Sequence, residues 1–225
     1  MTGILTNLAR PRIALVAALL TLSYFAAEWV VSATWRGHYS YRDDRIGPLG
    51  VAFCGTEGTW PCSALYPVLN VATVLTGLAI ITLALSWIAA RSVAATHGVL
   101  LAVAGAGFAL SGIFTEQVSY PTYATGLAVF TVLGPIAILL IGASNTTRLP
   151  ATAKLFAAVI GLLGIIARFA YTGHFVTVLG SGGTERVAVY AVLVAAIVLG
   201  VSGRNGRAEA TVVPASPAEL EEAEP

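Results

Sequence analysis

Two ionisable residues lie inside long apolar stretches of the sequence. Glu28 occurs in SYFAAEWVV, and Arg168 occurs in IIARFAYTG. A charged side chain at the centre of a membrane span costs about 2.5–3.5 kcal/mol on the insertion scale, so such residues are usually retained for a function. The two side chains could form an ion pair, or each could extend separately to the polar interface at little cost. The sequence leaves both arrangements open.

The two cysteines of the chain, Cys54 and Cys62, have seven residues between them in FCGTEGTWPCS. In an oxidising compartment this spacing predicts a disulfide, and closing a loop of about nine residues would contribute on the order of 2.5 kcal/mol. A redox-active pair is usually closer, as in Cys-x-x-Cys. A metal site needs two further ligands, and only His38 lies nearby. We therefore predict a disulfide and no metal, provided that this segment lies outside the cytoplasm.

The composition indicates which elements must position these residues. The chain has 225 residues, of which 57% are hydrophobic and 10% are charged, and its mean hydropathy is +0.83. Soluble domains carry about 25% charged residues, so the composition predicts an integral membrane protein. The formal net charge of +1 gives no electrostatic footprint for nucleic acid. We expect membrane lipid as a partner and no nucleic-acid partner.

Six apolar stretches are long enough to cross a membrane. Crossing roughly 30 Å of hydrocarbon takes about 20 apolar residues, and unsatisfied backbone groups in lipid force such a stretch to be helical. We predict an all-α fold, a polytopic bundle of six transmembrane helices within a membrane domain over residues 13–202. The predicted helices are 13–34, 66–89, 98–115, 123–144, 153–172 and 186–202.

The basic residues predict the orientation of these helices. With the N-terminal segment 1–12 in the cytoplasm, seven Lys and Arg residues lie inside, four lie outside and Arg168 is embedded, as the excess of positive charge on the cytoplasmic side requires. Both termini are then cytoplasmic in a multi-pass protein of the plasma membrane. The longest connection, 35–65, becomes an extracytoplasmic loop. Segment 203–225 is rich in Ala, Pro and Glu, which predicts a disordered acidic cytoplasmic tail.

Polar residues gather near the predicted outer ends of the helices. Asn70 lies about one turn into the second helix, Glu116 ends the third, and Glu28 and Arg168 lie in the outer third of the first and fifth. We expect these four candidate ligand-binding residues to line a polar cleft that opens outward beneath the loop. Aromatic residues at the same level are typical of an interfacial belt. These residues are Tyr24, Trp29, Trp35, Tyr66, Tyr120, Tyr123 and Tyr171.

No motif in the sequence identifies a reaction. A Walker loop, a GxSxG elbow and an HExxH pair are all absent. The histidines, His38, His97 and His174, lie outside the predicted spans or at the edge of one, which disfavours haem ligation inside the membrane. The run GSGGTE at 180–185 precedes the sixth helix and is interpreted as a flexible turn. We expect no cofactor, and the sequence identifies no catalytic residue.

Three stretches carry motifs that belong together in one bacterial family. They are HYSYRDDRIGPLG (38–50), CSALYPVLNVATVLTGL (62–78) and HGVLLAVAGAGFALSGIFTEQ (97–117). Over roughly residues 10–202 the chain resembles the membrane family called domain of unknown function 998. The positions that match the motifs of this family are Tyr39, Ser40, Leu49, Gly50, Cys62, Ser63, Asn70, Gly112, Phe114 and Glu116.

The chain departs from the family motifs at several positions. Gly47 and Pro48 replace a Ser-Asp pair, Leu69 replaces Met, and Thr115 replaces Pro. An activity of the family that depended on the aspartate would be absent from this chain. The resemblance implies a six-helix fold similar to that of lipid-remodelling membrane proteins, and it implies no established reaction.

Three functions are compatible with these patterns. In the first, the protein binds a lipid or small amphiphile in the outward-facing polar cleft. In the second, it is a membrane enzyme that acts on a lipid headgroup at the outer face, with Glu28 or Glu116 as general acid or base. Arg168 beside Glu28 would stabilise the ionised form of that carboxyl, which favours binding over proton chemistry. In the third, it transports a small solute, a role that a helix broken at Pro135 would suit, although no inverted repeat is evident.

Overall fold

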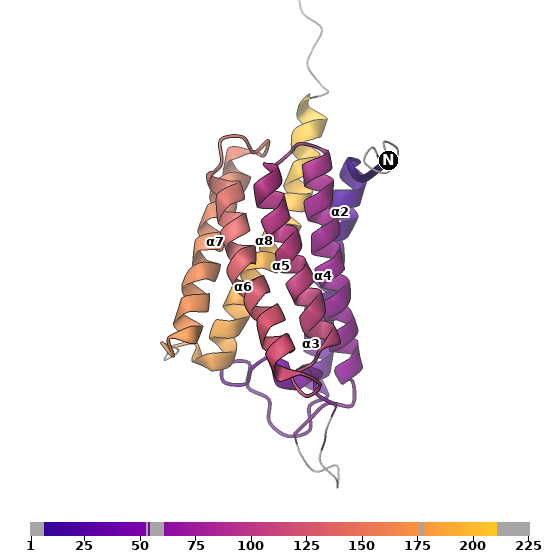
Figure 1. Cartoon of the computed structure of the whole chain (residues 1–225), viewed down its shortest axis with the longest axis vertical. Coiled ribbons are helices and arrows are strands. Elements are labelled where there is room, and N and C mark those ends of the chain that lie inside the picture. The colour runs from indigo at the N-terminus through magenta and orange to yellow at the C-terminus, as the bar shows by residue number, and fades with distance from the viewer. Residues whose placement is uncertain (1–6, 53, 55–60, 176–177, 211–225) are drawn as a thin grey trace, which may run out of the picture.

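A computed structural model describes residues 7–52, 54, 61–175 and 178–210 of the chain. Within these residues the regular secondary structure is helical, and no β-strand occurs. Six helical spans in this part of the chain are long and apolar enough to cross a membrane, so the predicted all-α bundle of six transmembrane helices is confirmed (Figure 1). The elements are α2 (Pro11–Leu20), α3 (Leu22–Ala33), η1 (Gly47–Gly50), α4 (Tyr66–Ala89), α5 (Ala95–Ile113), α6 (Tyr120–Ala143), α7 (Ala151–Thr172) and α8 (Gly180–Ala210).

The helix boundaries differ from the prediction mainly at the sixth span. Helices α2 and α3 together form the first span, Pro11–Ala33, close to the predicted range. Helix α8, however, begins at Gly180 instead of residue 186, so the glycine-rich run is its first turn. The same helix continues to Ala210, beyond the expected start of the tail at residue 203. Residues 211–225 lie outside the described part of the chain.

The helices form a closed bundle around α8. Helices α4 to α8 each pack against the next one along the chain, and α2 packs against both α4 and α8. The buried share of the membrane span is 67% for α8 and 22% for α7, so α8 is the inner helix and α7 is peripheral. Any charged residue on the first turns of α8 is therefore carried into the interior of the bundle.

Glycines permit the closest approaches between neighbouring helices. A Cβ atom placed on Gly105 of α5 would lie 2.7 Å from the carbonyl oxygen of Gly77 of α4. A Cβ atom placed on Gly107 would lie 2.6 Å from the carbonyl oxygen of Gly126 of α6. Both distances are shorter than real Cβ atoms tolerate. The glycines of α5 therefore allow its two neighbours to pack closely, as small residues commonly do in membrane bundles.

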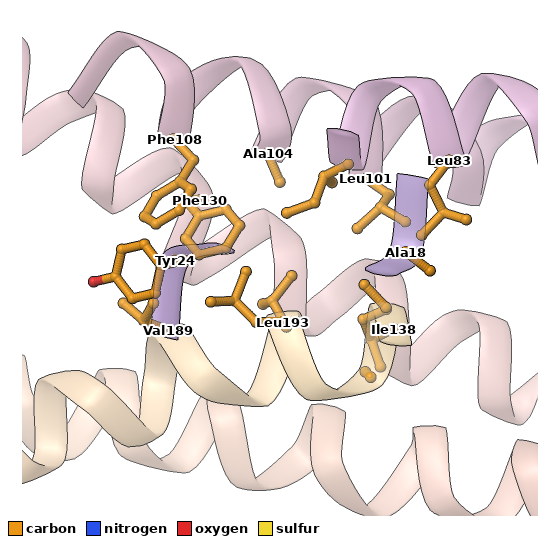
Figure 2. Packing of buried hydrophobic residues seen from close by; sticks show 14 of the residues in the cluster. Ala18, Tyr24, Leu83, Leu101, Ala104, Phe108, Phe130, Ile138, Val189 and Leu193 are labelled. Carbon is orange, nitrogen blue, oxygen red and sulfur yellow. The ribbon is translucent and has the colours of Figure 1, made fainter. Parts of the chain in front are cut away.

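Aromatic and aliphatic side chains fill the centre of the bundle (Figure 2). The rings of Phe108 and Phe130 are stacked, with centroids 4.1 Å apart, and the ring of Tyr24 lies 5.3 Å from that of Phe108. Aliphatic side chains that include Leu83 and Ile138 continue the core away from these rings. The aromatic cluster places α3, α5 and α6 at fixed positions around α8.

The long connection between α3 and α4 lies at the end of the bundle that we call the loop end, where α3 ends and α8 begins (Figure 1). Cys54 and Cys62 form the predicted disulfide, with their Cα atoms 5.3 Å apart. Residues 53 and 55–60 of this connection lie outside the described residues. The amide of Arg36 donates a hydrogen bond of 2.7 Å to the carbonyl oxygen of Cys62. The two ends of the connection are thereby joined next to the helices that they leave and enter.

Candidate binding site

A buried ion pair joins the first span to α8 at the loop end. Nε of Arg186 donates a hydrogen bond of 2.7 Å to Oε1 of Glu28, and the two side chains are 5% and 1% exposed. The second carboxylate oxygen of Glu28 accepts a hydrogen bond of 2.7 Å from the hydroxyl of Tyr190. Both oxygens of Glu28 are therefore occupied by partners within the protein.

The partner of Glu28 is thus Arg186, and the pairing of Glu28 with Arg168 that we considered from the sequence is wrong. The sequence placed Arg186 outside the membrane, at the beginning of the sixth helix. Because α8 begins at Gly180, Arg186 lies between one and two helical turns inside it. The buried position of the inner helix then brings Arg186 against Glu28.

The remaining donors of Arg186 bind the α3–α4 connection. Nη1 donates to the carbonyl oxygens of Tyr41 at 2.9 Å and Asp44 at 2.8 Å, and Nη2 contacts the hydroxyl of Tyr39. Burial raises the pKa of Tyr39 above its usual value, and the adjacent guanidinium opposes this rise only in part. Arg186 therefore fixes the connection to the bundle while Glu28 neutralises its charge.

The glycine-rich run packs tightly under the same segment of the connection. Gly180 has a φ of +71°, and a Cβ atom placed on Gly182 would overlap the carbonyl oxygen of Asp44. The hydroxyl of Ser181 donates a hydrogen bond of 2.6 Å to the carbonyl oxygen of Asp43. The amide of Gly183 donates a hydrogen bond of 2.9 Å to the carbonyl oxygen of Arg42. The run is therefore a packed helical turn, and our interpretation of it as a flexible turn is wrong.

A polar pocket with a volume of about 130 Å³ lies at the loop end, between the connection and helices α6, α7 and α8. Two arginines and two glutamates line it, namely Arg45, Arg168, Glu116 and Glu185. Hydroxyl groups and rings come from Tyr120, Tyr123 and Tyr171. The sequence identified Glu116 and Arg168 as candidates and interpreted these tyrosines as an interfacial belt. It did not single out Arg45 or Glu185.

Glu116 is only partly matched by the protein. Nη2 of Arg45 lies 3.4 Å from Oε1 of Glu116. Burial lowers the pKa of Arg45, but the Glu116 carboxylate and the Tyr171 hydroxyl raise it by more, so it lies above its usual value. The other oxygen, Oε2, is buried and receives no hydrogen bond from the described residues. A Cβ atom placed on Gly47 would overlap this oxygen, so glycine at position 47 leaves room for the carboxylate.

Arg168 carries a charge that no acidic side chain neutralises directly. Its guanidinium lies over the ring of Tyr171, 5.9 Å from the ring centroid. Among the residues that the structure describes, no carboxylate oxygen lies within 4.0 Å of it. Glu185, which also lines the pocket, is 5% exposed, and its Oε2 accepts a hydrogen bond of 2.8 Å from the amide of Ile46. The pocket therefore holds one incompletely matched cation, Arg168, and one incompletely matched anion, Glu116.

Asn70 lies outside this pocket. Its Nδ2 donates a hydrogen bond of 3.0 Å to the carbonyl oxygen of Gly50, and it lines a smaller cavity of about 20 Å³. The smaller cavity shares Tyr123 with the pocket and also contains Tyr24, whose hydroxyl has no hydrogen-bond partner among the described residues. The four candidates therefore do not converge on one cavity, because Glu28 belongs to the ion pair and Asn70 to the adjoining space.

The fold and these buried charges are those of a multi-pass membrane protein. No family model, no curated protein and no solved structure matches the chain.

Proposed function

We propose that this protein lies in the plasma membrane with both termini in the cytoplasm and binds the polar head of a lipid or small amphiphile in the pocket at its loop end. The distribution of Lys and Arg supports this orientation. The disulfide between Cys54 and Cys62 supports it independently, because disulfides persist in oxidising compartments. The pocket then opens near the outer interface of the membrane.

The observation that carries the proposal is the pair of unmatched groups in one cavity. Leaving a buried polar atom without a hydrogen bond costs about 1–3 kcal/mol, and more for a charged group. Oε2 of Glu116 is in this condition, and Arg168 lies over the ring of Tyr171 with no carboxylate of the described residues within 4.0 Å. A polar ligand that binds both groups would recover this free energy, whereas an empty pocket leaves it unrecovered.

The surface beside the pocket suits a hydrocarbon chain. On the adjoining face of α7, a shallow apolar groove is lined by Ile165, Ile166 and Phe169 and by Phe175 just beyond the helix. Phe169 and Phe175 are among the most exposed large apolar side chains described. A molecule with its head against Arg168 could lay its tail along this groove, so an amphiphile fits the site better than a wholly polar solute.

The structure weakens one part of each alternative function, although Glu116 stays available to the enzyme alternative. Glu28 is an unsuitable general acid or base because Arg186 and Tyr190 occupy both of its oxygens. A transporter would use a helix broken at Pro135, but α6 continues from Tyr120 to Ala143 without interruption. We also propose membership of the family called domain of unknown function 998, on the resemblance of the stretches 38–50, 62–78 and 97–117 to its motifs.

Native mass spectrometry of the purified protein tests the binding proposal. Wild-type protein should retain a co-purifying lipid, and Arg168→Gln and Glu116→Gln should lose most of it. Arg148→Gln is the matched control, since Arg148 is exposed in the connection between α6 and α7. Retention of the same lipid by all three variants, or the absence of any lipid from the wild type, would refute the proposal.

A further inference from the structure

We infer that the group bound in the pocket is a compact zwitterion, with a primary ammonium that contacts Glu116 and a phosphate that contacts Arg168. The inference rests on the proposed binding function and specifies the chemistry of the ligand. Two sources supply this chemistry: the headgroup of an aminoalkyl phospholipid and a free aminoalkyl phosphate.

The first argument is the balance of charge in the pocket. Arg45 and Arg168 contribute two positive charges, and Glu116 and Glu185 contribute two negative charges, so the formal charge of the lining is zero. A ligand with a net charge would leave that charge uncompensated in a partly desolvated site, which is costly. A zwitterion introduces no net charge.

The second argument is that the unmatched groups have opposite signs. Arg168 has no carboxylate within 4.0 Å among the described residues, and a guanidinium binds phosphate through two parallel hydrogen bonds. Oε2 of Glu116 needs a hydrogen-bond donor, and an ammonium supplies one that also carries the complementary charge, whereas the hydroxyls of a glycerol headgroup are neutral donors. A ligand with both an acceptor end and a donor end satisfies both groups.

The third argument distinguishes a primary ammonium from a quaternary one. A trimethylammonium group has no N–H and would leave Oε2 of Glu116 without a donor. Quaternary ammonium groups are held instead by the faces of aromatic rings. Of the tyrosines that line the pocket, Tyr171 already has the guanidinium of Arg168 over its ring. The pocket is therefore better suited to an ammonium that donates hydrogen bonds.

The fourth argument is size. A volume of about 130 Å³ corresponds to roughly four water molecules at about 30 Å³ each. A short aminoalkyl group has room in this space with its phosphate beside Arg168. The arrangement also leaves the acyl chains outside the pocket, next to the apolar groove of α7.

A competition experiment with short-chain lipids tests the inference. The delipidated protein is titrated in detergent with dihexanoyl phosphatidylethanolamine, phosphatidylcholine and phosphatidylglycerol, and binding is measured by native mass spectrometry. We expect phosphatidylethanolamine to bind about tenfold more tightly than the other two, the ratio for one hydrogen bond to a charged group. Glu116→Gln should abolish this preference, and Arg168→Gln should weaken the binding of all three lipids.

The outcomes separate the inference from the function on which it rests. Equal or tighter binding of phosphatidylglycerol or phosphatidylcholine would overturn the zwitterion and its primary ammonium while supporting a lipid site. Failure of every lipid to bind would overturn the proposed function itself. Displacement of phosphatidylethanolamine by an equal concentration of free phosphoethanolamine would support the zwitterion and assign it to a soluble source. Arg148→Gln, which lies outside the pocket, is the control and should leave the preference unchanged.

Discussion

Removing the charge of Glu28 or of Arg186 should destabilise the protein more than removing any other charge at the loop end. In Glu28→Gln, the guanidinium of Arg186 stays buried among the carbonyl oxygens of Tyr41 and Asp44 without a negative charge. Arg186→Gln leaves the complementary carboxylate buried with only the hydroxyl of Tyr190 as a donor. Each change breaks a pair whose side chains are 1% and 5% exposed.

The expected magnitude follows from this burial. Breaking a buried ion pair by removing one partner costs about 3–5 kcal/mol, because the remaining charge is not compensated. Removing both charges eliminates the unmatched charge, so the double variant should lose less than the sum of the single losses. The difference, a coupling free energy of about 1–3 kcal/mol, measures the pair itself.

Unfolding of the purified protein in mixed micelles with increasing denaturing detergent measures these free energies, with tryptophan fluorescence as the signal. A parallel cycle combines Glu28→Gln with Arg168→Gln. Because Arg168 is partly exposed and pairs with no carboxylate, its variant should lose no more than about 0.5 kcal/mol and should show no coupling. Additive losses for Glu28 and Arg186, or a clear coupling between Glu28 and Arg168, would refute the ion pair that the structure places in the bundle.

Three other predictions concern the α3–α4 connection. Gly182→Ala should lower the free energy of unfolding by about 1–3 kcal/mol, because the new Cβ atom would overlap the carbonyl oxygen of Asp44. Gly183→Ala is the control and should cost less in the same assay, because no atom lies closer than 3.4 Å to a Cβ atom placed there. Cys54→Ser should lower the free energy of unfolding by on the order of 2.5 kcal/mol. On intact cells, a membrane-impermeant maleimide should not label the wild-type protein, because both cysteines are in the disulfide. Ready labelling would disprove the external disulfide. The raised pKa of Tyr39 means that the folded state holds the phenolic proton more tightly than the unfolded state does. The stability that this protonated hydroxyl contributes is complete below about pH 10 and is lost as the pH rises further. Tyr39→Phe should therefore show a shallower alkaline loss of stability, and an unchanged slope would contradict the burial of this hydroxyl.

The sequence predicted the membrane spans because a single physical rule governs them. A stretch of about 20 apolar residues in lipid has no other way to satisfy its backbone than to form a helix. The first span and the second, Tyr66–Ala89, were consequently predicted nearly to the residue. The disulfide was equally accessible, since it depends on two cysteines, their spacing and the compartment.

The ends of the helices obeyed no such rule. Helix α8 begins at Gly180 because Ser181, Gly182 and Gly183 contact the segment 42–44, which is distant in sequence. Hydropathy is local and could not register these contacts, so the sixth helix was predicted to start too late. That displacement put Arg186 in the wrong environment, so it was not considered as a partner for Glu28.

In the candidate site, too, the sequence predicts some residues and only the fold brings in the others. Glu116 and Arg168 stand out in the sequence because charged residues near apolar spans are rare, and both line the pocket. Arg45 and Glu185 look like ordinary residues of a connection, and they join the pocket only because the connection folds back across the bundle onto α8. By itself the sequence determined the six helices and the disulfide, since each depends on local composition and spacing. Only the tertiary structure decided which charges neutralise one another and which remain unmatched, because Coulomb and hydrogen-bond partners are set by distance in space between segments far apart along the chain.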